Sequence, residues 1–274
     1  GLCRLDAKGW TRFTAPNDLP SNRINDLVAT SKHLYVATDL GLVVIDHKGN
    51  FVQRTVDQCS EDLKRKCPWH ASVNGVAVDR QKNTSWMADI GAVHRMRGRI
   101  WKRFFRDRGL SSQKLTRIAA RNGHVAVGSS DQGVFLRKGR RDFKRFDDQN
   151  GLSDNWVMDL EFDAEGRLWV GTCTKGISIW EKGTWSHLGT EDGLADDYVL
   201  ALKELSGEMW VGTLSGLTVF GKCGAETLST EHGLSGNEVH DFLLYDGHVY
   251  VATDGGLSLI RVLNDSQREA SCSQ

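Results

Sequence analysis

The sequence predicts an all-β fold, a six-bladed β-propeller of four-stranded antiparallel blades. Three observations predict it. An aromatic–Val–small–Thr motif recurs along the chain, a glycine that opens an apolar run follows each copy, and no hydrophobic period of 3.6 residues persists over three turns. Four short strands in each period of about 40 residues are typical of a propeller blade.

The recurring motif sets the period. The segment WVGT at 169–172 returns at 210–213, and the related YVAT at 35–38 returns at 250–253. Looser copies lie at 86–88 and 126–129. The glycines that follow the six copies are 40 to 50 residues apart: Gly41, Gly91, Gly133, Gly176, Gly216 and Gly256.

Each repeat divides into four strands, because β-branched and aromatic runs alternate with Gly, Asp, Asn and Ser turns. In the fourth repeat we expect strands at 156–162, 167–172 and 176–181, and another that begins near Trp185. The whole chain is predicted to be one propeller domain, 1–274, with blades at about 15–55, 68–105, 109–147, 151–189, 193–229 and 233–262.

The sixth repeat lacks an outer strand, and residues 9–14 resemble one. We therefore predict that this N-terminal strand completes the last blade and closes the ring, because an open ring leaves an unpaired edge. Residues 1–5 also resemble a third strand, so a ring of seven blades remains the alternative.

Composition fits a folded globular protein: 39% of residues are hydrophobic, 26% are charged, and only 3 are proline. The longest apolar runs have five or six residues, far short of the roughly 20 that span a bilayer, so no membrane insertion is expected.

The zero net charge hides two sectors of opposite sign. Residues 95–145 carry 16 basic and 3 acidic groups, whereas residues 146–274 carry 7 basic and 22 acidic groups. Sectors of opposite charge on two copies of the chain predict self-association.

The basic sector predicts a rim that binds an acidic protein or polyanion. The alternative is that these charges only protect outer strands from aggregation. No nucleic acid is expected, since no reader motif occurs. The rim candidates are Arg103, Arg106, Arg140, Arg141, Lys144 and Arg145.

The six cysteines show no metal or CxxC spacing. If the protein is exported, the favoured disulfides are Cys59–Cys67, which closes a short loop, and Cys3–Cys272, which joins the two termini. Free buried thiols are the alternative.

The pattern GLSDNxVxDL, followed by GxLWVGT, Gly-Ile or Gly-Leu and a further Trp, resembles the two-component regulator propeller repeat. The resemblance covers nearly the whole chain. It implies an extracytoplasmic ligand-binding domain of the kind found in bacterial histidine-kinase sensors, many of which respond to carbohydrates. A periplasmic or secreted location follows from it.

One position varies while its neighbours repeat: the residue before the first strand of each blade, at the mouth of the channel. A constant scaffold with one varied position is what a shaped binding site needs. Aromatic faces there would stack on a sugar and charged groups would bind its hydroxyls, so we predict a small polar ligand or glycan. Ordinary exposed loop residues are the alternative. The ligand candidates are Arg23, Lys114, Trp156, Tyr198 and Glu238, with Arg117 from an inner strand.

Inner strands also carry Asp26, Asp159 and Asp241, and His240 lies beside the last of these. The alternative function is therefore a channel lyase or hydrolase that uses His240, Asp241 and Asp159 as acid and base. The competing interpretation is that the aspartates bond backbone amides of the neighbouring blade. No cofactor is expected. Calcium is conceivable at the turn aspartates, but no DxDxDG loop is present, so no metal is predicted.

Overall fold

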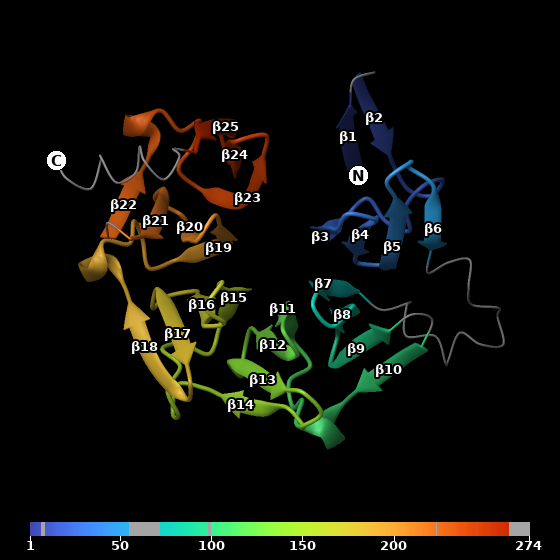
Figure 1. Cartoon of the computed structure of the whole chain (residues 1–274), viewed down its shortest axis with the longest axis horizontal. Helices are drawn as coiled ribbons and strands as arrows, with labels where there is room; N and C mark the ends of the chain where they lie inside the picture. The colour runs from blue at the N-terminus through green and yellow to red at the C-terminus, as the bar shows by residue number, and fades with distance from the viewer. Residues whose placement is uncertain (7–8, 55–71, 98–99, 223, 263–274) are drawn as a thin grey trace. The chain divides into compact units, whose positions relative to one another are not determined.

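Residues 1–6, 9–54, 72–97, 100–222 and 224–262 are described by the structure, a computed structural model of the chain. The strands confirm the predicted fold class, a six-bladed β-propeller (Figure 1). The chain divides into two compact units, Gly1–Arg145 and Phe146–Gln274.

The first unit holds three four-stranded sheets, each in simple sequential order. Their strands are β3 (Ile24–Ala29), β4 (His33–Thr38), β5 (Gly41–Asp46) and β6 (Phe51–Arg54); β7 (Val73–Asp79), β8 (Thr84–Asp89), β9 (Ala92–Arg97) and β10 (Ile100–Phe104); and β11 (Leu115–Arg121), β12 (His124–Ser129), β13 (Val134–Lys138) and β14 (Lys144–Phe146).

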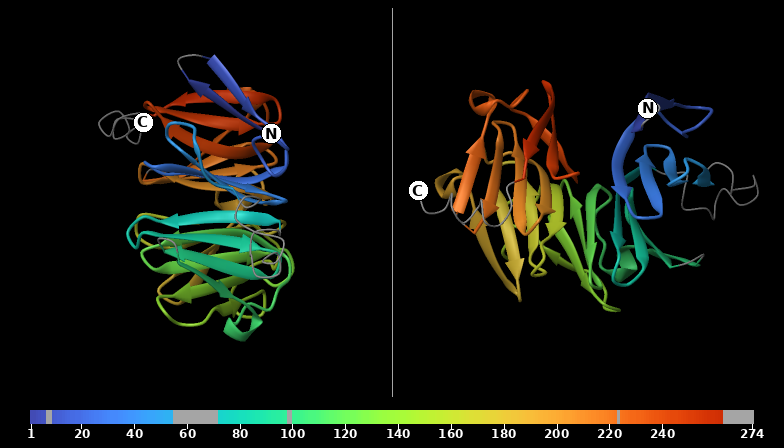
Figure 2. Two further views of the ribbon diagram at one scale, coloured as in Figure 1. Left: turned by 90° about the vertical axis from the view of Figure 1, so that its right-hand side faces the viewer. Right: turned by 45° about the horizontal axis from the view of Figure 1, so that its top comes forward.

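The second unit continues the pattern. Its strands are β15 (Val157–Phe162), β16 (Leu168–Thr172), β17 (Ile177–Glu181) and β18 (Thr184–Leu188); β19 (Val199–Leu205), β20 (Glu208–Thr213), β21 (Leu217–Gly221) and β22 (Gly224–Leu228); and β23 (Val239–Tyr245), β24 (His248–Thr253) and β25 (Gly256–Arg261). Within each unit the first strands of successive sheets lie side by side, β3–β7–β11 and β15–β19–β23 (Figures 1 and 2).

The repeated motif has a local physical cause. The threonine that ends the second strand of a blade donates its hydroxyl to the carbonyl of the glycine that follows, over 2.8 Å for both Thr172–Gly176 and Thr213–Gly216. This bond closes the turn into the third strand. The glycine inside the motif has a different cause: a Cβ on Gly212 would collide with the backbone carbonyl of Val239 in the next blade.

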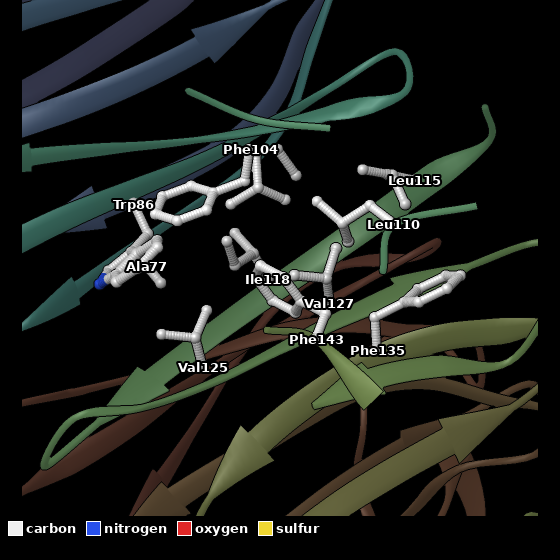
Figure 3. Packing of buried hydrophobic residues seen from close by; sticks show 12 residues of the cluster. Ala77, Trp86, Phe104, Leu110, Leu115, Ile118, Val125, Val127, Phe135 and Phe143 are labelled. Atoms are coloured by element: carbon white, nitrogen blue, oxygen red, sulfur yellow. The ribbon is translucent and has the colours of Figure 1, made fainter. Parts of the chain in front are cut away.

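Apolar side chains fill the space between neighbouring sheets. The cluster between the second and third blades contains Trp86, Phe104, Leu115, Phe135 and Phe143, all nearly fully buried (Figure 3). Similar clusters lie between the first and second, fourth and fifth, and fifth and sixth blades. The blades therefore stabilise one another by burying their faces in pairs.

The two N-terminal strands pair with each other. β2 (Gly9–Phe13) pairs along its whole length with β1 (Leu2–Asp6), and the sheet β23–β24–β25 has three strands among the described residues. The reason is packing, since Leu2 and Phe13 lie against the apolar cluster of the first blade around Leu19, Val36 and Val43. The predicted fourth-strand role of residues 9–14 in the last blade would join the two units, and it stays a prediction.

Cys3 is exposed and Cys173 is buried, and the two form no disulfide with any other described cysteine. The partners predicted for disulfides, Cys59, Cys67 and Cys272, lie outside the described residues. Both disulfides stay predictions.

Candidate functional site

In five of the six blades a side-chain oxygen accepts the backbone N–H of the residue before the first strand. In the fourth and fifth blades the residue before the strand donates its N–H to an aspartate two positions earlier: Trp156 to Asp154 Oδ1 over 3.0 Å, and Tyr198 to Asp196 Oδ1 over 2.8 Å. Side-chain oxygens cap the equivalent amides of the first, third and sixth blades: Ser21 for Arg23, Ser112 for Lys114, and Asp254 for Glu238.

The same capping residues tie this loop to the turn between the second and third strands. Asp154 Oδ2 accepts from the backbone N–H and the hydroxyl of Thr174, at 3.1 and 2.9 Å. Asp196 Oδ2 accepts the hydroxyl of Ser215 at 2.6 Å, and the Ser112 hydroxyl donates to Asp131 at 2.6 Å. The two loops of each of these blades therefore form one braced surface, which we call the mouth loops. The side chain of the varied residue is not needed for the bracing.

In the second unit the mouth loops bring two predicted aromatics to one cysteine. The backbone N–H of the buried Cys173 donates to the carbonyl of Trp156 over 3.0 Å. A hydrogen bond with the Cys173 thiol, aided by partial burial, raises the pKa of Tyr198 above its ordinary value. Trp156 keeps 49% of its surface exposed, which is unusual for so large an apolar side chain. The Tyr198 phenol and the backbone of Trp156 thus contact the same cysteine, and the Trp156 side chain is open to solvent.

The other predicted ligand residues take part in different contacts. Glu238 is exposed in the second unit, and Arg23 is exposed in the first. Lys114 lies 3.9 Å from Asp131 in an exposed ion pair. Arg117 is half-buried in the bulge of β11, where its guanidinium donates to the carbonyl of Thr116 over 3.4 Å.

Two of the inner-strand aspartates serve as ties between blades. Asp26 Oδ2 accepts the N–H of Val76 at 2.8 Å, and Asp159 Oδ2 accepts the N–H of Leu202 at 2.7 Å. The interpretation that these carboxylates bond amides of the next blade is therefore confirmed. Asp241 is exposed and accepts the N–H of its own neighbour Phe242 at 2.8 Å.

His240 falls at a bulge, because the register of β23 with β24 shifts between Val239 and Asp241. The equivalent bulge residues of the first and second blades, Asn25 and Asn74, donate to a backbone carbonyl of the following blade, over 2.9 and 2.7 Å. The position is thus one from which a side chain reaches a neighbouring blade. The role of His240, Asp241 and Asp159 in catalysis stays a prediction.

An ion pair on the inner strands was missed by sequence analysis. Lys203 Nζ lies 3.4 Å from Glu161 Oε2, and the pKa of Lys203 is raised, chiefly by the charge of Glu161 and further by Asp159 and Asp241. These residues stand on neighbouring first strands, so only the alignment of β15, β19 and β23 brings them together.

The predicted basic rim lies on the outer strands and turns of the second and third blades. Arg103, Arg140, Arg141, Lys144 and Arg145 are exposed, and the side chain of Arg106 lies outside the described parts. Arg103 stacks on the Phe105 ring, with 4.1 Å from its guanidinium carbon to the ring centroid.

Within the described ranges, no three His, Cys, Asp or Glu side chains gather as metal ligands. No helix in the part of the chain that the structure describes is long and apolar enough to cross a membrane.

The fold and the braced mouth loops define a β-propeller with an accessible, sequence-variable loop surface. Residues 151–174 match the family model described as two component regulator propeller, which confirms the resemblance in that repeat. No curated protein sequence matches the chain.

Solved structures share the fold at low identity. The extracellular domain of BT4673 from B. thetaiotaomicron, described as a hybrid two component system, is 17% identical with a TM-score of 0.71, over 96% of this chain and 36% of its own. For the corresponding domain of BT3049 these values are 18%, 0.67, 89% and 35%. PorZ, a surface component of the type-IX secretion system of Porphyromonas gingivalis, is 16% identical with a TM-score of 0.63, over 87% of this chain and 38% of its own. The chain thus spans less than half the length of these structures.

Proposed function

We propose that the chain is an extracytoplasmic binding module whose mouth loops recognise a carbohydrate or another small polar ligand. One observation carries the proposal. The mouth loops are held by hydrogen bonds from Asp154, Asp196 and Ser112, while the residue that follows each of these by two positions varies in size and charge. Such a division leaves the varied side chains free for recognition. The extracellular domains that share the fold support an extracytoplasmic location.

The chemistry of the second unit favours a ligand with hydroxyl groups. The open face of Trp156 offers the flat apolar surface on which a sugar ring stacks. The Tyr198 phenol, which bonds the Cys173 thiol, keeps an oxygen that can accept a hydrogen bond from a ligand hydroxyl. Glu238 is exposed and accepts hydrogen bonds from hydroxyls.

A thermal-shift screen against glycans and metabolites tests the proposal, with calcium and EDTA arms. A ligand at 100 times its dissociation constant adds about 2.7 kcal/mol to the free energy of unfolding. We expect a hit whose shift is lost in Trp156→Ala and kept in Trp10→Ala, a matched control at a tryptophan that is 72% exposed on β2. A hit unaffected by Trp156→Ala would contradict the site.

We propose the basic rim as a second, independent surface, for an acidic protein or polyanion. Its support is the exposure of five of its six predicted residues on two adjacent blades. Self-association through the oppositely charged sectors is a related proposal, and sedimentation at low and high salt tests it, since salt screens exposed charges.

A further inference from the structure

Two arginines, one in the second blade and one in the third, lie against the same indole ring. We call this ring of Trp86, together with the neighbouring ring of Phe104, the aromatic floor. Arg95 on β9 is the cross-strand partner of Trp86 on β8, and its guanidinium carbon lies 5.9 Å from the centroid of the indole ring. Arg137 on β13 is only 4% exposed, and its guanidinium carbon lies 5.5 Å from the same ring and 4.6 Å from the centroid of Phe104. Figure 3 shows Trp86 and Phe104 together in the buried cluster.

Two buried donors on this floor lack acceptors. Arg95 Nε and Trp86 Nε1 are buried, and neither has a hydrogen-bond partner among the described residues. Arg137 Nε donates to the carbonyl of Arg141 over 2.6 Å. Buried donors without acceptors cost free energy and are rare in native proteins, so a group that accepts from them is expected.

The charges around the floor are also unbalanced. Arg108 is a third nearby guanidinium, and it holds the carboxylates of Asp142 and Asp107, at 3.3 and 3.7 Å. Burial, followed by the charge of Arg95, lowers the pKa of Arg137, while Asp142 partly opposes this. Among the described residues, the two stacked arginines thus carry more positive charge than the neighbouring carboxylates neutralise.

We propose that Arg95 and Arg137, on the floor of Trp86 and Phe104, form a site for a phosphate or sulfate group. The planar guanidinium fork matches a tetrahedral oxyanion, and such an anion offers more oxygen acceptors than a carboxylate to the unpaired donors. The site lies beside the turn between β13 and β14, at the opposite strand ends from the mouth loops of its blades. It is therefore independent of the ligand proposed for the mouth loops.

The test is a titration followed by the indole N–H signals of the ¹⁵N-labelled protein. The Trp86 signal is assigned by its loss in Trp86→Phe. The ionic strength is held constant with chloride. We expect the Trp86 signal to shift saturably with inorganic phosphate or sulfate. Acetate, titrated in the same way, should bind about ten-fold more weakly. In Arg95→Gln the affinity for phosphate should fall about ten-fold, whereas Arg12→Gln, an equal loss of charge at an exposed arginine of β2, should change it less than about two-fold.

Absence of saturation with both anions, or equal losses in Arg95→Gln and Arg12→Gln, would overturn the proposal. If Arg95→Gln does not fold, Arg95→Lys decides: it keeps the charge but lacks the planar fork, so weaker phosphate binding supports the site and unchanged binding overturns it. A parallel titration with glucose 6-phosphate tells whether the bound phosphate belongs to a sugar ester or is the free anion. Tighter binding than inorganic phosphate assigns the site to a sugar ester, and equal binding assigns it to the anion alone.

Discussion

The tie between the fourth and fifth blades is predicted to contribute measurably to stability. Asp159 Oδ2 accepts the N–H of Leu202 at 2.7 Å, and Leu202 is 3% exposed, so water does not replace the carboxylate freely. Asp159→Ala leaves a buried donor unsatisfied, which costs about 1–3 kcal/mol. With a central value of about 2 kcal/mol, and roughly 2–4 °C per kcal/mol for a chain of this size, Tm should fall by roughly 4–8 °C.

Urea unfolding of matched variants measures this cost. Asp159→Asn keeps an acceptor but loses the charge, so we expect roughly half of the destabilisation. Asp246→Asn makes the same chemical change in an exposed turn and should stay within about 0.5 kcal/mol of wild type. If Asp159→Ala unfolds at the same urea concentration as Asp246→Asn, the tie contributes nothing and the reasoning fails.

Three further variants test other parts of the account. The raised pKa of Tyr198 means that its stabilising contribution is complete below the ordinary tyrosine pKa of about 10 and is lost as pH rises through the folded value. Cys173→Ala should lower that pKa in an ultraviolet titration, and an unchanged value would exclude the thiol as its cause. Gly212→Ala should destabilise by about 1–3 kcal/mol in urea, because its methyl group meets backbone of the next blade, and a neutral effect would contradict that close approach. Reversal of both Arg140 and Arg141 to Glu should abolish capture of an acidic partner in a pull-down and leave small-ligand binding intact; retained capture would remove the rim proposal.

Repetition made the fold accessible to sequence analysis. The Thr of the WVGT motif and the glycine that follows the motif recur because the same hydrogen bond closes the same turn, as at Thr172 and Gly176. The pairing of the two N-terminal strands could not be predicted from the repeats. The alternation in residues 9–13 predicts a strand but does not choose its partner, and burial of Leu2 and Phe13 against the first blade favours β1.

The candidate site was predicted only in part. The varied position was visible in the sequence, and the recurring Asp or Ser two residues before it, as at Asp154 and Ser112, was an available signal for the capped frame. The contact of Tyr198 with Cys173 was not foreseen, because it joins neighbouring blades through a cysteine outside any motif. The same holds for Arg95 and Arg137, whose shared floor depends on how two sheets pack.

The most direct test of the binding proposal is the dissociation constant of the best ligand from the screen, measured by calorimetry. The account predicts weaker binding in Trp156→Ala by about ten-fold or more, since an aromatic stacking contact and its buried area are lost, while Trp10→Ala binds as wild type does. Equal dissociation constants for the wild type and both variants would contradict the assignment of the mouth loops as the binding site.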